Sequence, residues 1–149
     1  MNPAPDLLAQ RLAQARVNDP LEFGAYSQSS GDDRKEPIQW RLLDRSDRSV
    51  LLLSDRILDC RRYHHTFAET TWRGCDLRAW LNGEFCAAAF TDEDRTLLEP
   101  AACTDNGNGA PDTADSVFLL SVKEVRTLTG PGNGAHGVRP AIRLRSPTA

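Results

Sequence analysis

Three short strand patterns follow one another in the first third of the chain, and no helical pattern separates them. Residues 21–26 alternate apolar and polar side chains, and residues 38–43 repeat this alternation. Residues 50–54 form a short, almost wholly apolar segment that ends at Ser54, which is typical of a strand buried on both faces. The connecting segments 27–36 and 44–49 are polar and turn-like. Because antiparallel strands can be joined by short turns, whereas parallel strands need long crossovers, this order predicts an antiparallel meander.

A helical pattern precedes the first strand. Residues 6–17 are rich in strong helix formers and place Leu8 and Leu12 on one face. The full chain has 149 residues, a length that suits one domain better than two. We therefore expect a helical extension over residues 1–19, followed by a single domain over residues 20–149.

The middle of the chain is also helical in pattern. Leu77, Trp80 and Leu81 lie at i, i+3 and i+4. The following Asn82 and Gly83 predict the end of this helix, because both residue types are common just beyond helix C-termini.

A further helix is expected after Thr91. Thr91 can cap its first turn, and the acidic residues 92–94 suit the positive end of the helix dipole. Leu97 and Leu98 are expected to face inward, and Pro100 closes the helix.

Two more strands are predicted near the C-terminal end. Residues 117–120 and 138–144 are both apolar or alternating. Pro140 cannot donate a ladder hydrogen bond, so the last strand is expected at a sheet edge or at a bulge. Residues 104–115, which are rich in Asn, Gly and Asp, are expected to form a surface loop.

Composition excludes several classes of protein. The longest purely apolar run is residues 85–90, far short of the ~20 residues that a membrane helix needs. The formal net charge of −3 argues against non-specific binding to nucleic acid, which depends on cationic patches. The first residues lack the pattern of a secretory signal, so a cytoplasmic location is expected.

Four cysteines and three histidines supply the candidates for thiol or metal chemistry. Cys60 and His64 are separated by three residues, His65 follows, and Cys75 could add a third ligand if the fold brings it close. Zinc needs three or four convergent ligands, and a nucleophilic Cys–His pair needs an orienting group and an oxyanion hole. Neither is evident, so we expect reduced thiols, mostly buried, rather than a metal or catalytic centre.

The segment around residues 105–115 carries several oxygen ligands, among them Asp105, Asp112 and Asp115. Calcium prefers six to eight such oxygens. Because Gly107 stands where a calcium loop of the EF-hand type would have a ligand, we expect a polar loop rather than a metal site.

The three tryptophans divide into two groups. Trp40 and Trp80 lie on the apolar faces of their predicted elements and are expected in the core, whereas Trp72 is expected to be the more exposed. The sequence around Trp72 is also rich in cationic and aromatic side chains, which can bind anions or proteins. The candidate binding set is Arg61, Arg62, Tyr63, Trp72 and Arg73. Contact between segments 60–75 and 104–115 would favour one joint site.

The order of several motifs resembles a known family. These motifs, in chain order, are Phe23-Gly24 and Tyr26, Pro37-Ile38 with Trp40-Arg41, Leu51-Leu52-Leu53-Ser54, Ile57 to Arg61, Thr71-Trp72, Leu77-Arg78 with Trp80 to Gly83 and Phe85, Ala89-Phe90, Asp115 with Val117 to Ser121, and Val138-Arg139-Pro140-Ala141. Together they resemble the bacterial domain-of-unknown-function family 6273, over about residues 21–144.

This resemblance implies an α+β fold similar to C-type-lectin-like domains, a group that includes formylglycine-generating-type domains. It implies a small antiparallel sheet with two or three short helices, in which the N- and C-terminal strands are adjacent. Relatives carry a long segment between the last two strands, where lectin-like folds often bind ligands. Here only residues 122–137 intervene, so this chain is shortened in that region.

Three functions follow as hypotheses. The first is a non-catalytic binding or protein-interaction module for an unknown protein or small molecule, with no cofactor. The second is a cysteine-dependent enzyme, by analogy with the formylglycine-generating relatives. The third is a structural remnant of a larger system. No nucleic acid or membrane partner is expected.

Overall fold

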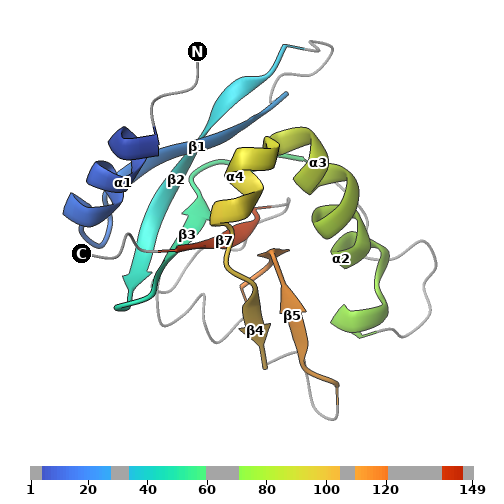
Figure 1. Ribbon diagram of the computed structural model, residues 1–149. Helices are drawn as coiled ribbons and strands as arrows, with labels where there is room; N and C mark the ends of the chain where they lie inside the picture. Colours follow the sequence, from blue (N-terminus) through green and yellow to red (C-terminus); the bar gives the residue numbers. More distant parts are fainter. Residues whose placement is uncertain (1–4, 28–33, 60–70, 105–109, 121–138, 146–149) are drawn as a thin grey trace.

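The computed structural model describes residues 5–27, 34–59, 71–104, 110–120 and 139–145, and it has an α+β architecture (Figure 1). Its helical elements are α1 (Pro5–Gln14), the 3-10 turn η1 (Trp72–Gly74), α2 (Asp76–Trp80), the π-helical turn η2 (Leu81–Phe85), α3 (Cys86–Ala89) and α4 (Asp92–Leu97). Its strands are β1 (Pro20–Tyr26), β2 (Glu36–Arg45), β3 (Ser49–Ser54), β4 (Ala101–Cys103), β5 (Thr113–Asp115), β6 (Val117–Phe118) and β7 (Ala141–Arg145). None of the described helices is both long and apolar enough to cross a membrane.

The main sheet has the strand order β1-β2-β3-β7-β6, and each neighbouring pair is antiparallel. The predicted meander is thus confirmed in β1, β2 and β3. The prediction that the N- and C-terminal strands are adjacent is wrong, because β2 and β3 separate β1 from β7. The physical reason lies in β3, whose residues are all buried. Such a strand needs a partner on each side, and β7 supplies the second.

The prediction of an edge position for the last strand is also wrong. Strand β7 pairs with β3 on one side and with β6 on the other. Pro140 does not interrupt it, because the strand begins at Ala141. The Pro140 carbonyl instead accepts a hydrogen bond from the Ser54 backbone N–H at 3.0 Å. A proline immediately before a strand removes no bond from its ladder.

A second, two-stranded sheet was not predicted. Strands β4 and β5 pair antiparallel, with Ala101 opposite Asp115 and Cys103 opposite Thr113. Thr113–Asp115 therefore belongs to a strand rather than to the predicted loop. Strands of three residues are too short to give an alternation pattern that can be distinguished from a loop.

The predicted helix stop at Asn82 and Gly83 is wrong. The helix passes through both residues as η2 and continues into α3. The Asn82 side chain explains this, because its Nδ2 donates to the carbonyls of Arg78 (3.1 Å) and Val117 (2.8 Å). Its Oδ1 accepts from the backbone N–H groups of Ser116 (2.9 Å) and Val117 (3.0 Å). Asn82 thus joins the helix to the start of β6, and side-chain insertion of this kind accompanies π-turns within helices.

The predicted cap of the next helix is confirmed. The Thr91 hydroxyl accepts from the Asp94 backbone N–H at 3.1 Å, and the Asp94 carboxylate accepts from the Thr91 backbone N–H at 3.1 Å. This reciprocal pair forms a capping box at the start of α4. Leu98, just beyond α4, is buried and bridges to Leu144 of β7.

Aromatic rings fill the space between the sheet and the helices. Trp40 is fully buried, as predicted, and its Nε1 donates to the Phe23 carbonyl at 2.7 Å. The Phe90 ring lies 5.2 Å from that of Phe23 and 6.0 Å from that of Phe85, measured between centroids. Trp80 is half-buried and packs against this core. The core thus fixes α3 and the start of α4 against β1 and β2.

Helix α1 packs on the same core. Its Leu12 side chain is only 2% exposed, and Leu8 is half-buried against the core. The Arg45 guanidinium donates to the carbonyls of Ala13 and Ala15, just before and just after the helix C-terminus. These contacts hold α1 beside the strands β1 and β2, although the domain division at residue 19 stays a prediction.

Candidate functional site

Most of the sequence-predicted site residues lie outside the described residues. These are Cys60, Arg61, Arg62, Tyr63, His64, His65 and Asp105. Trp72, Arg73 and Asp112 are described, and the last two are exposed. Within the described residues, no group of three His, Cys, Asp or Glu side chains could hold a metal ion. The binding role of the predicted set stays a prediction.

The expectation that Trp72 is the most exposed tryptophan is wrong. Its side chain is only 6% exposed, and its Nε1 donates to Asp115 Oδ2 at 2.8 Å. An indole N–H that is buried needs an acceptor, and Asp115 supplies one. The ring of Trp72 therefore contributes to the core rather than to a surface.

Asp115 collects three donors and is itself only 1% exposed. Besides Trp72, Arg78 Nε donates to its Oδ1 at 2.7 Å and Thr113 Oγ1 donates to its Oδ2 at 2.8 Å. Arg78 also donates to the Arg73 carbonyl at 3.2 Å. Asp115 is therefore paired with the Arg78 guanidinium, and both of its carboxylate oxygens accept hydrogen bonds from protein groups. The contact does bring the end of segment 60–75 beside the end of segment 104–115.

The described cysteines are free thiols that are largely withdrawn from solvent. Cys75 and Cys86 are buried and Cys103 is half-buried. Cys75 caps α2, since its Sγ accepts from the Arg78 backbone N–H at 3.4 Å. Burial raises the pKa of the Cys86 thiol, and the nearby Arg95 charge offsets part of this effect. Cys86 thus has the opposite of the exposed, low-pKa environment that a catalytic thiol needs.

The alkylation rates of these thiols should therefore differ. In native protein at pH 7.5, iodoacetamide should modify Cys86 at least about tenfold more slowly than Cys103, because only the accessible thiolate reacts. Raising the pH to 8.5 should speed the modification of Cys86 by about tenfold, because both pH values lie below its raised pKa, yet leave it slower than in unfolded protein. Peptide mapping by mass spectrometry measures each site, and urea-unfolded protein is the control. Fast native modification of Cys86 would contradict this account.

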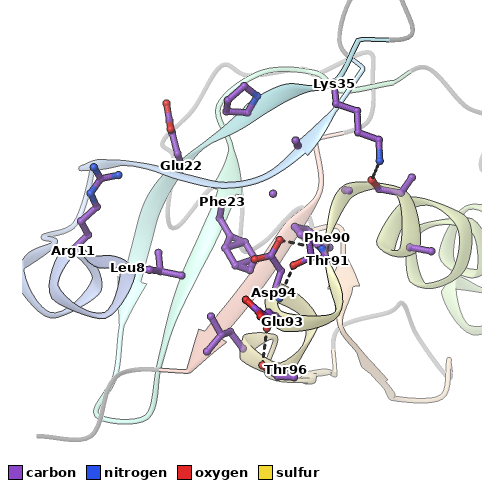
Figure 2. A pocket seen from close by; sticks show the side chains of 17 residues that line it. Leu8, Arg11, Glu22, Phe23, Lys35, Phe90, Thr91, Glu93, Asp94 and Thr96 are labelled. Carbon is purple, nitrogen blue, oxygen red and sulfur yellow. Dashed lines mark hydrogen bonds between the residues drawn. The ribbon is translucent and has the colours of Figure 1, made fainter. Parts of the chain in front are cut away.

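The described residues enclose a concavity that we call the α1–α4 groove (Figure 2). Its volume is about 660 Å³, within the range of ligand-binding sites. It lies between α1 on one side and the α3–α4 segment on the other, with β1 beneath. Its lining comprises Leu8, Arg11, residues 22–25, Lys35, Pro37, residues 87–91, Glu93, Asp94, Thr96 and Leu97.

The surface of the groove is mainly apolar. Phe23 and Phe90 form part of its floor, and Leu8 borders it from α1 (Figure 2). Leu97 of α4 also lines it. Lys35 lies at one end, where its Nζ donates to the Ala88 carbonyl. Gly24 brings β1 close to α3, because a Cβ at this position would lie 2.8 Å from the Ala89 carbonyl oxygen. The groove could not be found from sequence, since its two walls are about 80 residues apart in the chain.

A family described as a domain of unknown function (DUF6273) has a sequence model that matches residues 47–139, well over half of the chain. The chain belongs to this family. The DUF6273 match begins just before β3, so the α3–α4 wall of the groove lies within it, whereas α1 and β1 lie before it.

The other comparisons found no relatives. No curated protein and no solved structure matches the chain. The predicted membership of the DUF6273 family is thus confirmed, while the likeness to C-type-lectin-like folds stays a prediction.

Proposed function

We propose that this DUF6273 protein is a non-catalytic binding module whose ligand occupies the α1–α4 groove. The observation that supports this proposal is a groove of about 660 Å³ with an apolar floor and a few polar groups at its margins. This combination is characteristic of ligand sites in proteins. The groove also lies next to β1, an edge strand of the main sheet.

The shape of the groove is built into the core rather than left to surface side chains. Its floor residues Phe23 and Phe90 are buried and in ring contact. The Thr91–Asp94 capping box fixes the start of α4 beside them. A groove with a rigid floor can bind a ligand without first ordering its own residues, which lowers the free-energy cost of binding.

A cytoplasmic location is part of the same proposal. Free thiols at Cys75, Cys86 and Cys103 suit a reducing compartment.

A neutral apolar fluorophore tests the proposal. N-phenyl-1-naphthylamine should bind with increased fluorescence, and Ala87→Glu should weaken that binding at least about fivefold, because it places a carboxylate in an apolar site. Ala87 is exposed and lines the groove. Ala79→Glu is the matched control, since Ala79 is an exposed helical alanine that does not line it. Equal effects of the two substitutions, or no binding by the unmodified chain, would refute the proposal.

A further inference from the structure

We infer that the occupant of the α1–α4 groove is an amphipathic helix of a partner protein, which has acidic side chains on one flank and basic side chains on the other. This inference rests on the proposed function, because it assumes that the groove is a binding site. Three observations support it: the place of the groove in the fold, the obstructed edge of strand β1, and the charges on the two rims.

The groove is a gap between helices that cover a sheet. Helix α1 forms one wall and α4 forms the other, and both pack on the core beside β1 (Figure 2). Sheet faces in α+β domains are covered by helices that bury an apolar stripe. An apolar helix face would continue this layer, and helices commonly bind in apolar grooves through residues at i, i+3, i+4 and i+7.

An extended peptide that adds to the edge of β1 is the main alternative, and the edge is poorly suited to it. Pro20 has no N–H to donate, and the pairing of β1 with β2 is irregular between Glu22 and Ala25. Gly24 within this irregular region has a φ of +71°. Proline and bulges are features that prevent strand addition at sheet edges.

The two rims of the groove carry opposite charges that are available to a partner. Arg11 projects from α1 and Glu93 from α4 (Figure 2). Both are exposed, and neither side chain has a hydrogen-bond or ion-pair partner among the described residues. The other charged lining residues already have partners. Lys35 donates to the Ala88 carbonyl, and the Asp94 carboxylate accepts from the Thr91 N–H. The Glu22 carboxylate accepts from Gln39 Nε2 at 2.7 Å. A helix with an acidic flank toward Arg11 and a basic flank toward Glu93 would satisfy both rims.

Three designed helical peptides of about 18 residues test this inference. All share one leucine stripe, and they carry lysine on both flanks, glutamate on both flanks, or one of each. A helix that is turned end over end exchanges its flanks, so the mixed peptide can always match the rims. By fluorescence anisotropy, the chain should bind the mixed peptide at least about threefold more tightly than either uniform peptide, because rim charges select between partners.

Charge reversal on the protein gives the reciprocal test. Arg11→Glu makes both rims acidic, so the preference should change to the peptide with lysine on both flanks, by about threefold or more. Arg48→Glu is the matched control, because Arg48 is exposed and does not line the groove. This substitution changes the net charge by the same amount as Arg11→Glu. It should leave the preference for the mixed peptide intact. Replacing the leucine stripe by serine should abolish binding.

The outcomes separate this inference from the proposed function. If the neutral fluorophore binds in the groove and none of the peptides does, the helical partner is wrong and the binding module stands. If neither the fluorophore nor any of the peptides binds, the binding module and its helical partner are both wrong. If the chain forms a dimer that Ala87→Glu dissociates, a second copy is the occupant and the inference is overturned. The same preference in Arg11→Glu and Arg48→Glu would also overturn it.

Discussion

Replacing Gly24 by alanine should lower the free energy of unfolding by about 3 kcal/mol or more, because two separate costs combine. The first is conformational, since a φ of +71° is unfavourable for a residue with a Cβ. The second is steric, since that Cβ would lie 2.6 Å from Phe90 Cε1 and 2.8 Å from the Ala89 carbonyl oxygen. The Phe90 ring cannot move aside freely, because it packs against Phe23 and Phe85.

Urea unfolding of Gly24→Ala and of Gly83→Ala gives a matched comparison. A Cβ at Gly83 meets no atom within 4 Å, and Gly83 lies in the helical segment η2. Its replacement by alanine should stabilise the protein by about 0.5–1 kcal/mol, because alanine loses less conformational freedom in a helix. If Gly24→Ala unfolds at the same urea concentration as the unmodified chain, the close approach of β1 and α3 described above is wrong.

Asp115→Ala should destabilise the protein by about 3 kcal/mol, because it leaves three donors without their acceptor in or near the core. Trp72 Nε1 and Thr113 Oγ1 lose a buried partner, and Arg78 loses its ion pair. The loss should loosen the connection between η1, α2 and β5. Asp115→Asn keeps an acceptor oxygen but not the charge, so its effect should be intermediate.

The matched control is Asp112→Ala, three residues earlier in the same segment. Asp112 is exposed, and surface substitutions change stability by at most about 0.5 kcal/mol. Urea unfolding monitored by tryptophan fluorescence is informative here, because Trp72 reports directly on this cluster. Similar unfolding of Asp115→Ala and Asp112→Ala would show that the three hydrogen bonds contribute little to stability.

The two predicted effects concern different parts of the molecule. Gly24 lines the α1–α4 groove, whereas Asp115 lies in the connection between the helices and the small sheet. A folded but weakened Asp115→Asn variant should therefore keep the groove intact and bind the apolar fluorophore as before. This separates the stability of the fold from the integrity of the groove.

Local sequence patterns predicted the structure correctly where it depends on residues that are close together in the chain. The alternation in residues 21–26 and 38–43 and the apolar run in residues 50–54 predicted β1, β2 and β3, which pair through short connections. Thr91 and the acidic residues after it predicted the capped start of α4. In these cases the interacting groups lie within a few residues, or in consecutive strands, so the sequence contains the whole interaction.

Long-range contacts decided the rest. Asn82 and Gly83 are typical of a helix end. The helix nevertheless continues through them, and the Asn82 side chain accepts hydrogen bonds from Ser116 and Val117. Trp72 resembles a surface aromatic, yet Asp115, 43 residues later, gives its indole N–H a buried acceptor.

The amino-acid sequence by itself determined the fold class, the family, the strands β1 to β3 and the capped start of α4, because periodicity and capping act over short stretches of chain. Only the tertiary structure decided that β7 pairs with β3, that Trp72 is buried, and that α1 and α4 face each other across β1. These three features depend on hydrogen bonds and apolar contacts between side chains that are far apart in the chain. A pattern of neighbouring residues does not show which distant residues will form such contacts.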